Sequence, residues 1–120
     1  MRQILLAAAI ALMPVAAAAE ESRWGAVEAG SAEAAHLFRM GAEQGQVNSQ
    51  ETLGIMYAGG DGVPKDLVMA HMWLDIAATN GSLLAREYRD KIAEKMEPEQ
   101  IADAERRTKV CMESNYKQCD

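Results

Sequence analysis

The sequence predicts an all-α protein, a short α-solenoid of antiparallel helix hairpins with about five helices. Helix formers such as Ala, Glu, Met and Leu are frequent in the 120 residues, whereas Phe, Trp and Tyr together make up 5%. Gly45 and Gly81 lie 36 residues apart. The same offset relates four more pairs of small or apolar residues, which are Val27 and Val63, Ala34 and Ala70, Leu37 and Trp73, and Ala42 and Ala78. Such recurrence is typical of stacked helix–turn–helix units.

The predicted helices cover residues 32–43, 47–58, 66–79, 83–96 and 98–112. Gly45 and Gly81 each follow a helix, where the left-handed backbone that ends many helices suits a residue without Cβ. The carboxylate of Asp66 can cap the third helix, and Pro98 suits the first turn of the fifth. Two helices carry an apolar stripe that predicts a buried face. On the third helix the stripe contains Leu67, Ala70, Leu74, Ala77 and Ala78. On the fourth helix it contains Leu84, Tyr88, Ile92 and Met96.

The first 19 residues predict a secretory signal peptide. Arg2 is followed by the apolar run 4–13 and then Pro14, and Ala17 and Ala19 suit cleavage after Ala19. The run is shorter than the ~20 residues of a spanning helix, which disfavours a membrane anchor. We therefore expect a periplasmic or secreted protein that is free of the membrane after cleavage.

The mature chain is expected to begin with a lead-in at residues 20–31, ordered or disordered, ahead of a helical domain at residues 32–112. Cys111 and Cys119 are expected to form a disulfide that closes the tail at residues 113–120, because disulfides persist outside the cytoplasm. The alternatives are two free thiols or a metal site, and the absence of a neighbouring His disfavours the metal.

The charge pattern disfavours nucleic acid as a partner. The chain has 12 basic and 18 acidic residues, and its formal net charge is −6. It contains no run of Lys or Arg that would follow a phosphate backbone. An acidic surface also repels anionic lipid.

Residues 45–85 contain a spaced pattern of small, apolar and aromatic residues that resembles the Sel-one-like repeat, which is related to the tetratricopeptide repeat. The matching residues are Leu53, Gly54, Tyr57, Gly60, Gly62, Val63, Asp66, Ala70, Trp73, Ala77, Ala78, Gly81 and Ala85. One complete repeat spans residues 45–81, and residues 32–45 look like the second helix of a decayed copy. Beyond Ala85 the pattern fails, and the tail looks like a C-terminal cap.

The resemblance implies a non-enzymatic adaptor that binds another protein and uses no cofactor. Its matching residues have structural roles, such as Gly54 at a close helix crossing. We expect any partner groove between the second and fourth helices, with five exposed candidates: Gln46, Gln50, Glu51, Arg86 and Arg89. Because so short a solenoid offers a small surface, weak binding or self-association is expected. The alternative is a structural or stress-linked protein without a fixed partner.

The sequence also contains weaker signals for three more specific functions. The loop at residues 59–62 lacks the Gly-Lys-Ser/Thr of a phosphate loop. A copper site would use His36, His71 and nearby methionines (Met40, Met69 and Met72), although methionine is also common in helical cores. Some cysteine-rich relatives resemble weak β-lactam-binding or hydrolysing proteins, but this repeat has no Cys. Its one Ser-x-x-Lys spacing, from Ser114 to Lys117, has no accompanying motif.

Overall fold

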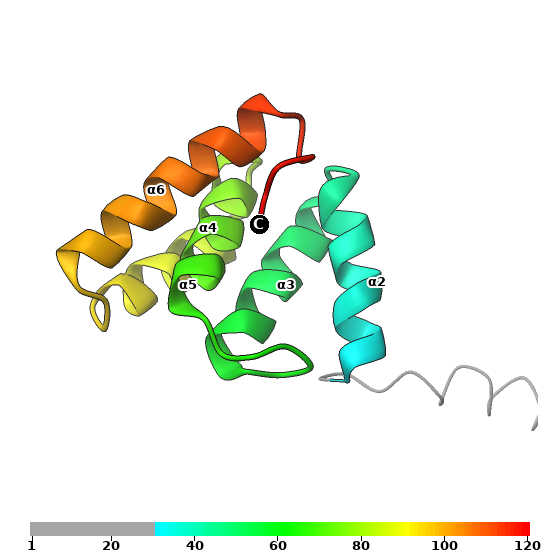
Figure 1. Cartoon of the computed structure of the whole chain (residues 1–120), viewed down its shortest axis with the longest axis horizontal. Helices are drawn as coiled ribbons and strands as arrows, with labels where there is room; N and C mark the ends of the chain where they lie inside the picture. The colour runs from blue at the N-terminus through cyan, green and yellow to red at the C-terminus, as the bar shows by residue number, and fades with distance from the viewer. Residues whose placement is uncertain (1–30) are drawn as a thin grey trace, which may run out of the picture.

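A computed structural model of the chain describes residues 31–120, which form five helices and no strand. The helices are α2 (Ala32–Glu43), α3 (Val47–Gly59), α4 (Leu67–Thr79), α5 (Leu83–Ala93) and α6 (Pro98–Glu113), as Figure 1 shows. The all-helical solenoid prediction is confirmed, and only the fourth helix ends three residues early. The predicted signal peptide and the lead-in up to residue 30 lie outside the described residues. Among the described residues, no helix is both long and apolar enough to cross a membrane.

Local chemistry explains where the helices begin and end. The side chains of Ser31, Asp66 and Ser82 each accept a hydrogen bond from a backbone N–H three residues later, which satisfies one free donor of α2, α4 and α5. The predicted cap at Asp66 is therefore confirmed. Gly45 and Gly81 have φ angles of 84° and 109°, so each takes the predicted left-handed backbone just after a helix.

Helix α4 is the centre of the fold, because α3, α5 and α6 all pack against it. Its Met72, Trp73, Leu74 and Ile76 are fully buried. Helix α2 packs on α3 at the other side of the molecule (Figure 1). Most of the hydrophobic core is thus built round α4, and a smaller buried cluster lies between α2 and α3.

The crossing of α3 over α4 depends on Gly54. A Cβ atom at this position would lie 2.7 Å from Leu74 Cγ and 3.2 Å from the backbone oxygen of Ala70. These distances leave no room for a side chain. The predicted role of Gly54 in a close helix crossing is confirmed.

The predicted buried stripe of α5 is only half correct. Ile92 and Met96 are buried, but Leu84 is 49% exposed and Tyr88 is 39% exposed. The physical reason is the position of α6, which packs along α4 and leaves the outer face of the first turns of α5 uncovered. On α4, the predicted residues Ala70, Leu74 and Ala77 are buried, while Leu67 and Ala78 are partly buried.

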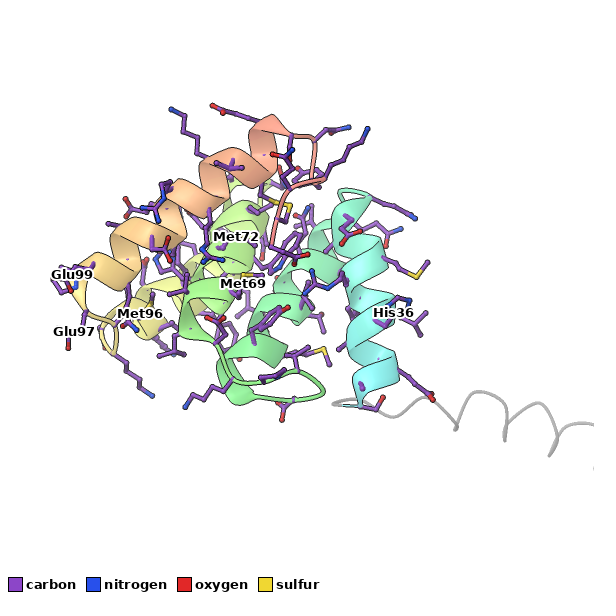
Figure 2. The ribbon with its side chains drawn as sticks, viewed as in Figure 1. His36, Met69, Met72, Met96, Glu97 and Glu99 are labelled. Atoms are coloured by element: carbon purple, nitrogen blue, oxygen red, sulfur yellow. A yellow bond between two sulfur atoms is a disulfide. The ribbon has the colours of Figure 1, made fainter. Side chains whose placement is uncertain are left out.

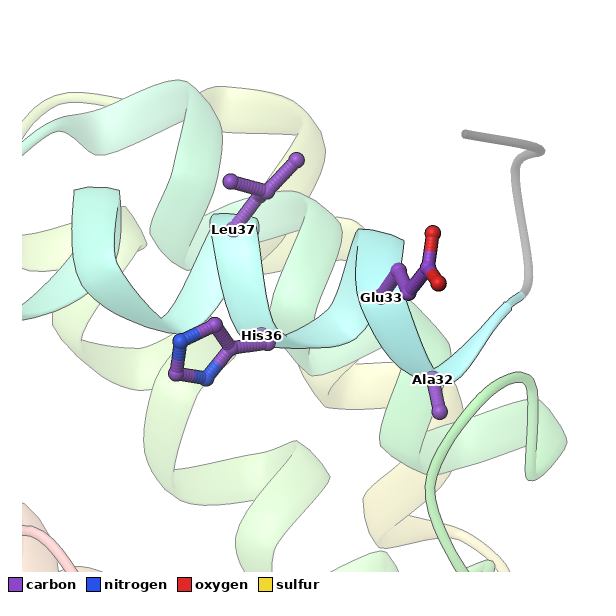
Figure 3. Close-up of a pocket in the computed structure, with 4 residues that line it drawn as sticks. All are labelled: Ala32, Glu33, His36 and Leu37. Carbon is purple, nitrogen blue, oxygen red and sulfur yellow. The ribbon is translucent and has the colours of Figure 1, made fainter. Parts of the chain in front are cut away.

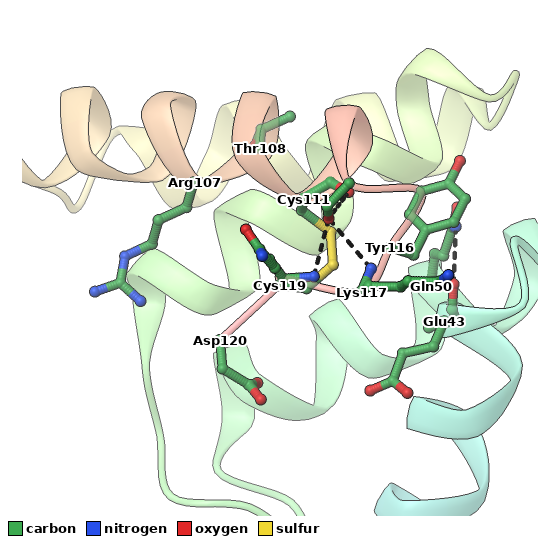
Figure 4. The surroundings of a disulfide bond; sticks show 12 residues. Glu43, Gln50, Arg107, Thr108, Cys111, Tyr116, Lys117, Cys119 and Asp120 are labelled. Carbon is green, nitrogen blue, oxygen red and sulfur yellow. Dashed lines mark hydrogen bonds between the residues drawn. A yellow bond between two sulfur atoms is a disulfide. The ribbon is translucent and has the colours of Figure 1, made fainter.

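The C-terminal tail folds back across the bundle (Figure 4). Cys111 and Cys119 are joined by a disulfide and are both buried, as the sequence predicts. Asp120 Oδ1 lies 2.7 Å from Arg39 Nη1 on α2, and Asn80 Nδ2 donates to the Tyr116 hydroxyl at 3.1 Å. The tail therefore ties α6 to α2 and to the end of α4.

Candidate peptide-binding groove

The structure separates the five predicted groove residues into exposed and structural ones. Gln46, just before α3, and Arg86 on α5 are exposed. Glu51 accepts a hydrogen bond from Ser82, and Arg89 pairs with Asp75 on α4 at 2.6 Å. An arginine engaged in this way ties α5 to α4, so reversing its charge would disturb the fold.

Gln50 is fully buried, so its prediction as an exposed groove residue is wrong. Its Nε2 donates to the Ala42 carbonyl at 3.2 Å, and its Oε1 accepts from Asn80 Nδ2 at 2.9 Å. Figure 4 shows Gln50 beside Tyr116, which shares Asn80 as a partner. Buried polar groups need such partners, because a lone one loses its hydration without compensation. Gln50 thus joins α2 to the residue that follows α4, and Asn80 in turn bonds the tail.

Replacing Gln50 with alanine is expected to lower the free energy of unfolding by about 1–3 kcal/mol, because the backbone carbonyl of the fully buried Ala42 loses its hydrogen-bond partner. Urea unfolding followed by circular dichroism measures this loss. Gln118→Ala is the matched control, since Gln118 is exposed in the tail. Equal stability of the two variants would contradict the structural role of Gln50.

A hollow of about 390 Å³ lies between the end of α3, the loop after it, and α5. Its apolar lining comes from Ile55 and Ala58 on α3, Leu67 on α4, and Tyr88 and Ile92 on α5. Helices α3 and α5 have few contacts with each other, because α4 packs against both. This spacing leaves the groove between them.

The charge of the groove is opposite to that of the chain. Three lysines line it, Lys65 after α3 and Lys91 and Lys95 on and just beyond α5, together with one acidic residue, Asp61. All four are exposed, whereas the whole chain has a formal net charge of −6. An apolar floor with a basic rim attracts a segment that combines apolar and acidic side chains.

The exposed part of the α5 stripe extends the groove. Leu84 and Tyr88 are one helical turn apart, so they share a face of α5, and Tyr88 lines the hollow. Exposed large apolar side chains grouped beside a hollow are typical of an interaction surface. Sequence reasoning assigned both residues to the core.

None of the thirteen repeat-signature residues lines this hollow. They form the scaffold instead: Leu53, Ala70, Trp73, Ala77 and Ala85 are fully buried. The hydroxyl of Tyr57 is hydrogen-bonded to Arg39, and burial raises the pKa of Tyr57. Gly60 and Gly62 have positive φ angles of 73° and 76°, which fit the turn after α3.

The residues of the copper-site alternative lie on two helices, α2 and α4, which do not pack closely against each other. His36 lies on the outer face of α2, while Met69 and Met72 lie on α4 beside α6 (Figure 2). His71 is buried on α4. Residues 31–120 contain no group of three or more His, Cys, Asp or Glu side chains suited to a metal ion. The copper-site alternative gains no support from this geometry.

The Ser114 hydroxyl has a structural role. It donates to the Cys111 carbonyl at 2.8 Å and accepts from the backbone N–H groups of Lys117 and Gln118 at 3.2 and 2.9 Å. These bonds shape the turn that follows α6. The Ser-x-x-Lys spacing therefore reflects a helix end, because a nucleophile needs a free hydroxyl beside a base.

His71 makes the protein sensitive to mild acid. Burial has the largest effect on the pKa of His71 and lowers it. Asp75 and Glu105 raise this pKa by smaller amounts, and Arg89 lowers it by a smaller amount. The folded state therefore favours the neutral ring. Its contribution to stability is complete above the unfolded pKa of ~6.5 and is lost as the pH falls towards the lower folded pKa.

We expect the wild-type protein to lose stability in urea between pH 7.5 and pH 5.5 more steeply than a His71→Met variant. His36→Gln is the control, since His36 is exposed. Its pH profile should follow that of the wild type. Identical profiles for all three proteins would contradict the account of His71.

The fold and the groove define the class of protein, an α-solenoid of two-helix repeats. The Sel1 repeat family model matches residues 17–46 and 48–82, together more than half of the chain, so the protein belongs to the Sel1 repeat family. No curated protein matches the chain significantly. The second match covers α3, the loop and α4, and the first ends just after α2. The first match starts at residue 17, so repeat sequence extends further upstream than residues 32–45.

Proposed function

We propose that this protein is a non-enzymatic adaptor of the bacterial periplasm that holds a segment of another protein in the groove between α3 and α5. Sel1 repeats suggest a role in protein–protein interaction, and this supports the adaptor assignment. The single observation that carries the proposal is the apolar hollow rimmed by Lys65, Lys91 and Lys95. Its volume falls in the usual range of ligand pockets, ~300–1,000 Å³.

The partner segment is expected to carry apolar side chains for the floor and acidic side chains for the lysine rim. Leu84 and Tyr88 supply further apolar contact along α5. The rim charges are exposed, so each pair contributes at most ~1 kcal/mol and acts mainly on specificity and association rate. The apolar floor must supply most of the affinity.

The periplasmic part of the proposal rests on the predicted signal peptide and on the disulfide between Cys111 and Cys119. Disulfides persist in oxidising compartments such as the periplasm. Cell fractionation with mass spectrometry of the N-terminus tests it. A chain that begins at Glu20 in the periplasmic fraction is expected, and an uncleaved chain in the cytoplasm would contradict it.

A selection from a displayed random peptide library tests the groove. Enriched peptides should combine acidic and apolar residues, and Lys91→Glu/Lys95→Glu should weaken their binding about tenfold, because two favourable pairs become repulsive. The control Lys109→Glu/Lys117→Glu makes the same charge change at exposed positions away from the groove.

Isothermal titration calorimetry of the enriched peptides measures both variants against the wild type. Equal weakening by both variants would show a non-specific charge effect and would contradict the proposed site. A selection that enriches no peptide would favour a structural protein without a fixed partner.

A further inference from the structure

The outer row of α5 has the spacing of a face that packs against another helix. It consists of Leu84, Tyr88, Lys91 and Lys95, which are all exposed and follow one another at intervals of 4, 3 and 4 residues. Alternating intervals of three and four keep side chains on one side of a helix, as in paired helices. Helix α5 packs mainly on α4 and makes few contacts with α3. None of the described helices therefore covers this outer row.

The opposite wall of the groove allows a close approach. Ile55 and Ala58 on α3 are three residues apart, so they share one face of that helix, and both line the hollow. Gly59 ends α3 and lines it too. Small side chains such as those of Ala58 and Gly59 let two helix axes come near the short end of the usual ~8–10 Å. This wall therefore has room for the backbone of an incoming helix.

The groove provides no backbone partner for an extended segment. Residues 31–120 form helices and no strand, so they present no sheet edge to which a bound strand could add. The N–H and C=O groups of an extended segment would lose water against the apolar floor without gaining partners there. A helix satisfies most of these groups internally. The floor therefore favours a helical occupant.

The charges of the groove are gathered at one end. Lys91 and Lys95 lie at the end of α5 and Lys65 lies in the loop after α3, where they outnumber Asp61. Helices α3 and α5 both end here, so the negative ends of their dipoles point to this place. Both features favour the positive N-terminus of an incoming helix that carries acidic side chains in its first turn.

We propose that the partner segment in this groove is an amphipathic α-helix that lies antiparallel to α5, with acidic residues in its first turn and apolar residues along the face that follows. This inference rests on the proposed function of the groove and adds the conformation and direction of the occupant. The acidic turn lies against Lys91 and Lys95, and the apolar face covers Tyr88 and Leu84. Apolar burial supplies the affinity, and the charges set the direction.

The exposed apolar face of α2 is a poorer site for such a helix. Leu37 and Met40 are 53% and 46% exposed there, beside a hollow of about 480 Å³ (Figure 3). Ala32, Glu33, His36 and Leu37 line this hollow, so its lining includes a carboxylate and no Lys or Arg. Like charges that face each other disfavour binding, which directs an acidic helix to the lysines instead. Leu37 is therefore a suitable control position.

Isothermal titration calorimetry with three synthetic peptides of identical composition tests the inference. Each peptide has about 14 residues, roughly four helical turns. The first has glutamates in its first turn and leucines at helical spacing. The second has its leucines at every second position, and the third has the helical pattern with the glutamates in the last turn. We expect the first peptide to bind about tenfold more tightly than the others and to gain helical circular dichroism on binding.

Two pairs of variants place the binding. Lys91→Glu/Lys95→Glu should remove the preference for the first peptide over the third, whereas the control Lys109→Glu/Lys117→Glu should keep it. Tyr88→Asp should weaken binding of the first peptide about tenfold, because a charge enters the apolar contact. Leu37→Asp places the same charge at an exposed apolar position on α2 and should leave the affinity unchanged. Circular dichroism should show that all four variants keep their helices.

The possible failures are distinguishable. Equal or tighter binding of the alternating peptide overturns the helical conformation, and equal binding of the first and third peptides overturns the direction. If library-selected peptides bind the groove without gaining helix and no designed peptide binds, the helical occupant is overturned while the groove stands. If neither selected nor designed peptides bind, the proposed function of the groove fails, and this inference fails with it.

Discussion

Replacing Trp73 with alanine is expected to lower the free energy of unfolding by about 3–5 kcal/mol, the range for removing a buried aromatic side chain from a core. Trp73 is fully buried on α4, the helix that α3, α5 and α6 all pack against. The cavity would therefore lie at the centre of the fold, where no mobile loop can collapse into it. Marginal domains have only about 5–15 kcal/mol of stability, so this variant should be close to unfolding.

Urea unfolding monitored by far-ultraviolet circular dichroism measures the effect. Tyr88→Ala is the control, because it also removes an aromatic ring but from an exposed position on α5. We expect its loss of stability to stay within about 0.5 kcal/mol, as for other surface substitutions. Similar losses in the two variants would contradict the central position of α4.

Removing the disulfide with Cys111→Ser/Cys119→Ser is expected to cost about 2–3 kcal/mol, the chain-entropy value for so short a loop. The cross-link closes a sequence separation of 8 residues. Its loss also frees the tail, which Asp120 holds to Arg39 and Tyr116 holds to Asn80. Amide exchange should therefore speed up at the end of α6 before it does in α4.

Dithiothreitol provides an internal comparison for this prediction. The reduced wild-type protein should lose about as much stability as the double variant, and the variant itself should not respond to the reductant. A wild-type protein whose unfolding midpoint is unchanged on full reduction would contradict the stabilising role of the cross-link.

The sequence predicts the helices well because their ends depend on local chemistry. Asp66, Gly45 and Gly81 act through backbone bonds within a few residues, and their effect does not depend on the rest of the fold. The disulfide follows from two cysteines eight residues apart with only each other as partners. Gly54 was recognisable through the repeat pattern, which carries information on helix packing.

The faces of α3 and α5 are harder to predict, because periodicity shows which side chains share a face but not whether a neighbour covers it. Leu84 and Tyr88 share a face with Ile92, yet α6 packs on α4 and leaves the first two exposed. Gln50 looks like a surface residue until Ala42 and Asn80 are brought to it by the fold.

The groove has a weak sequence signal that becomes clear in the structure. Lys91 and Lys95 continue the α5 periodicity of Leu84 and Tyr88, and this mixed stripe marks a face that is apolar at one end and basic at the other. Lys65 comes from the loop after α3, and no local pattern connects it to α5. Because the repeat signature specifies the scaffold, the binding residues must be sought among the positions that the signature leaves variable.

Site-specific photo-crosslinking from Tyr88 in living cells is the most direct test of the groove between α3 and α5. A photoreactive amino acid at Tyr88 should crosslink to one protein through an acidic, apolar segment, and Lys91→Glu/Lys95→Glu should reduce the yield of that product. The same amino acid at the exposed Val110 on α6 should give no such product. The absence of a product from Tyr88, or the same product from both positions, would contradict the groove as the partner site.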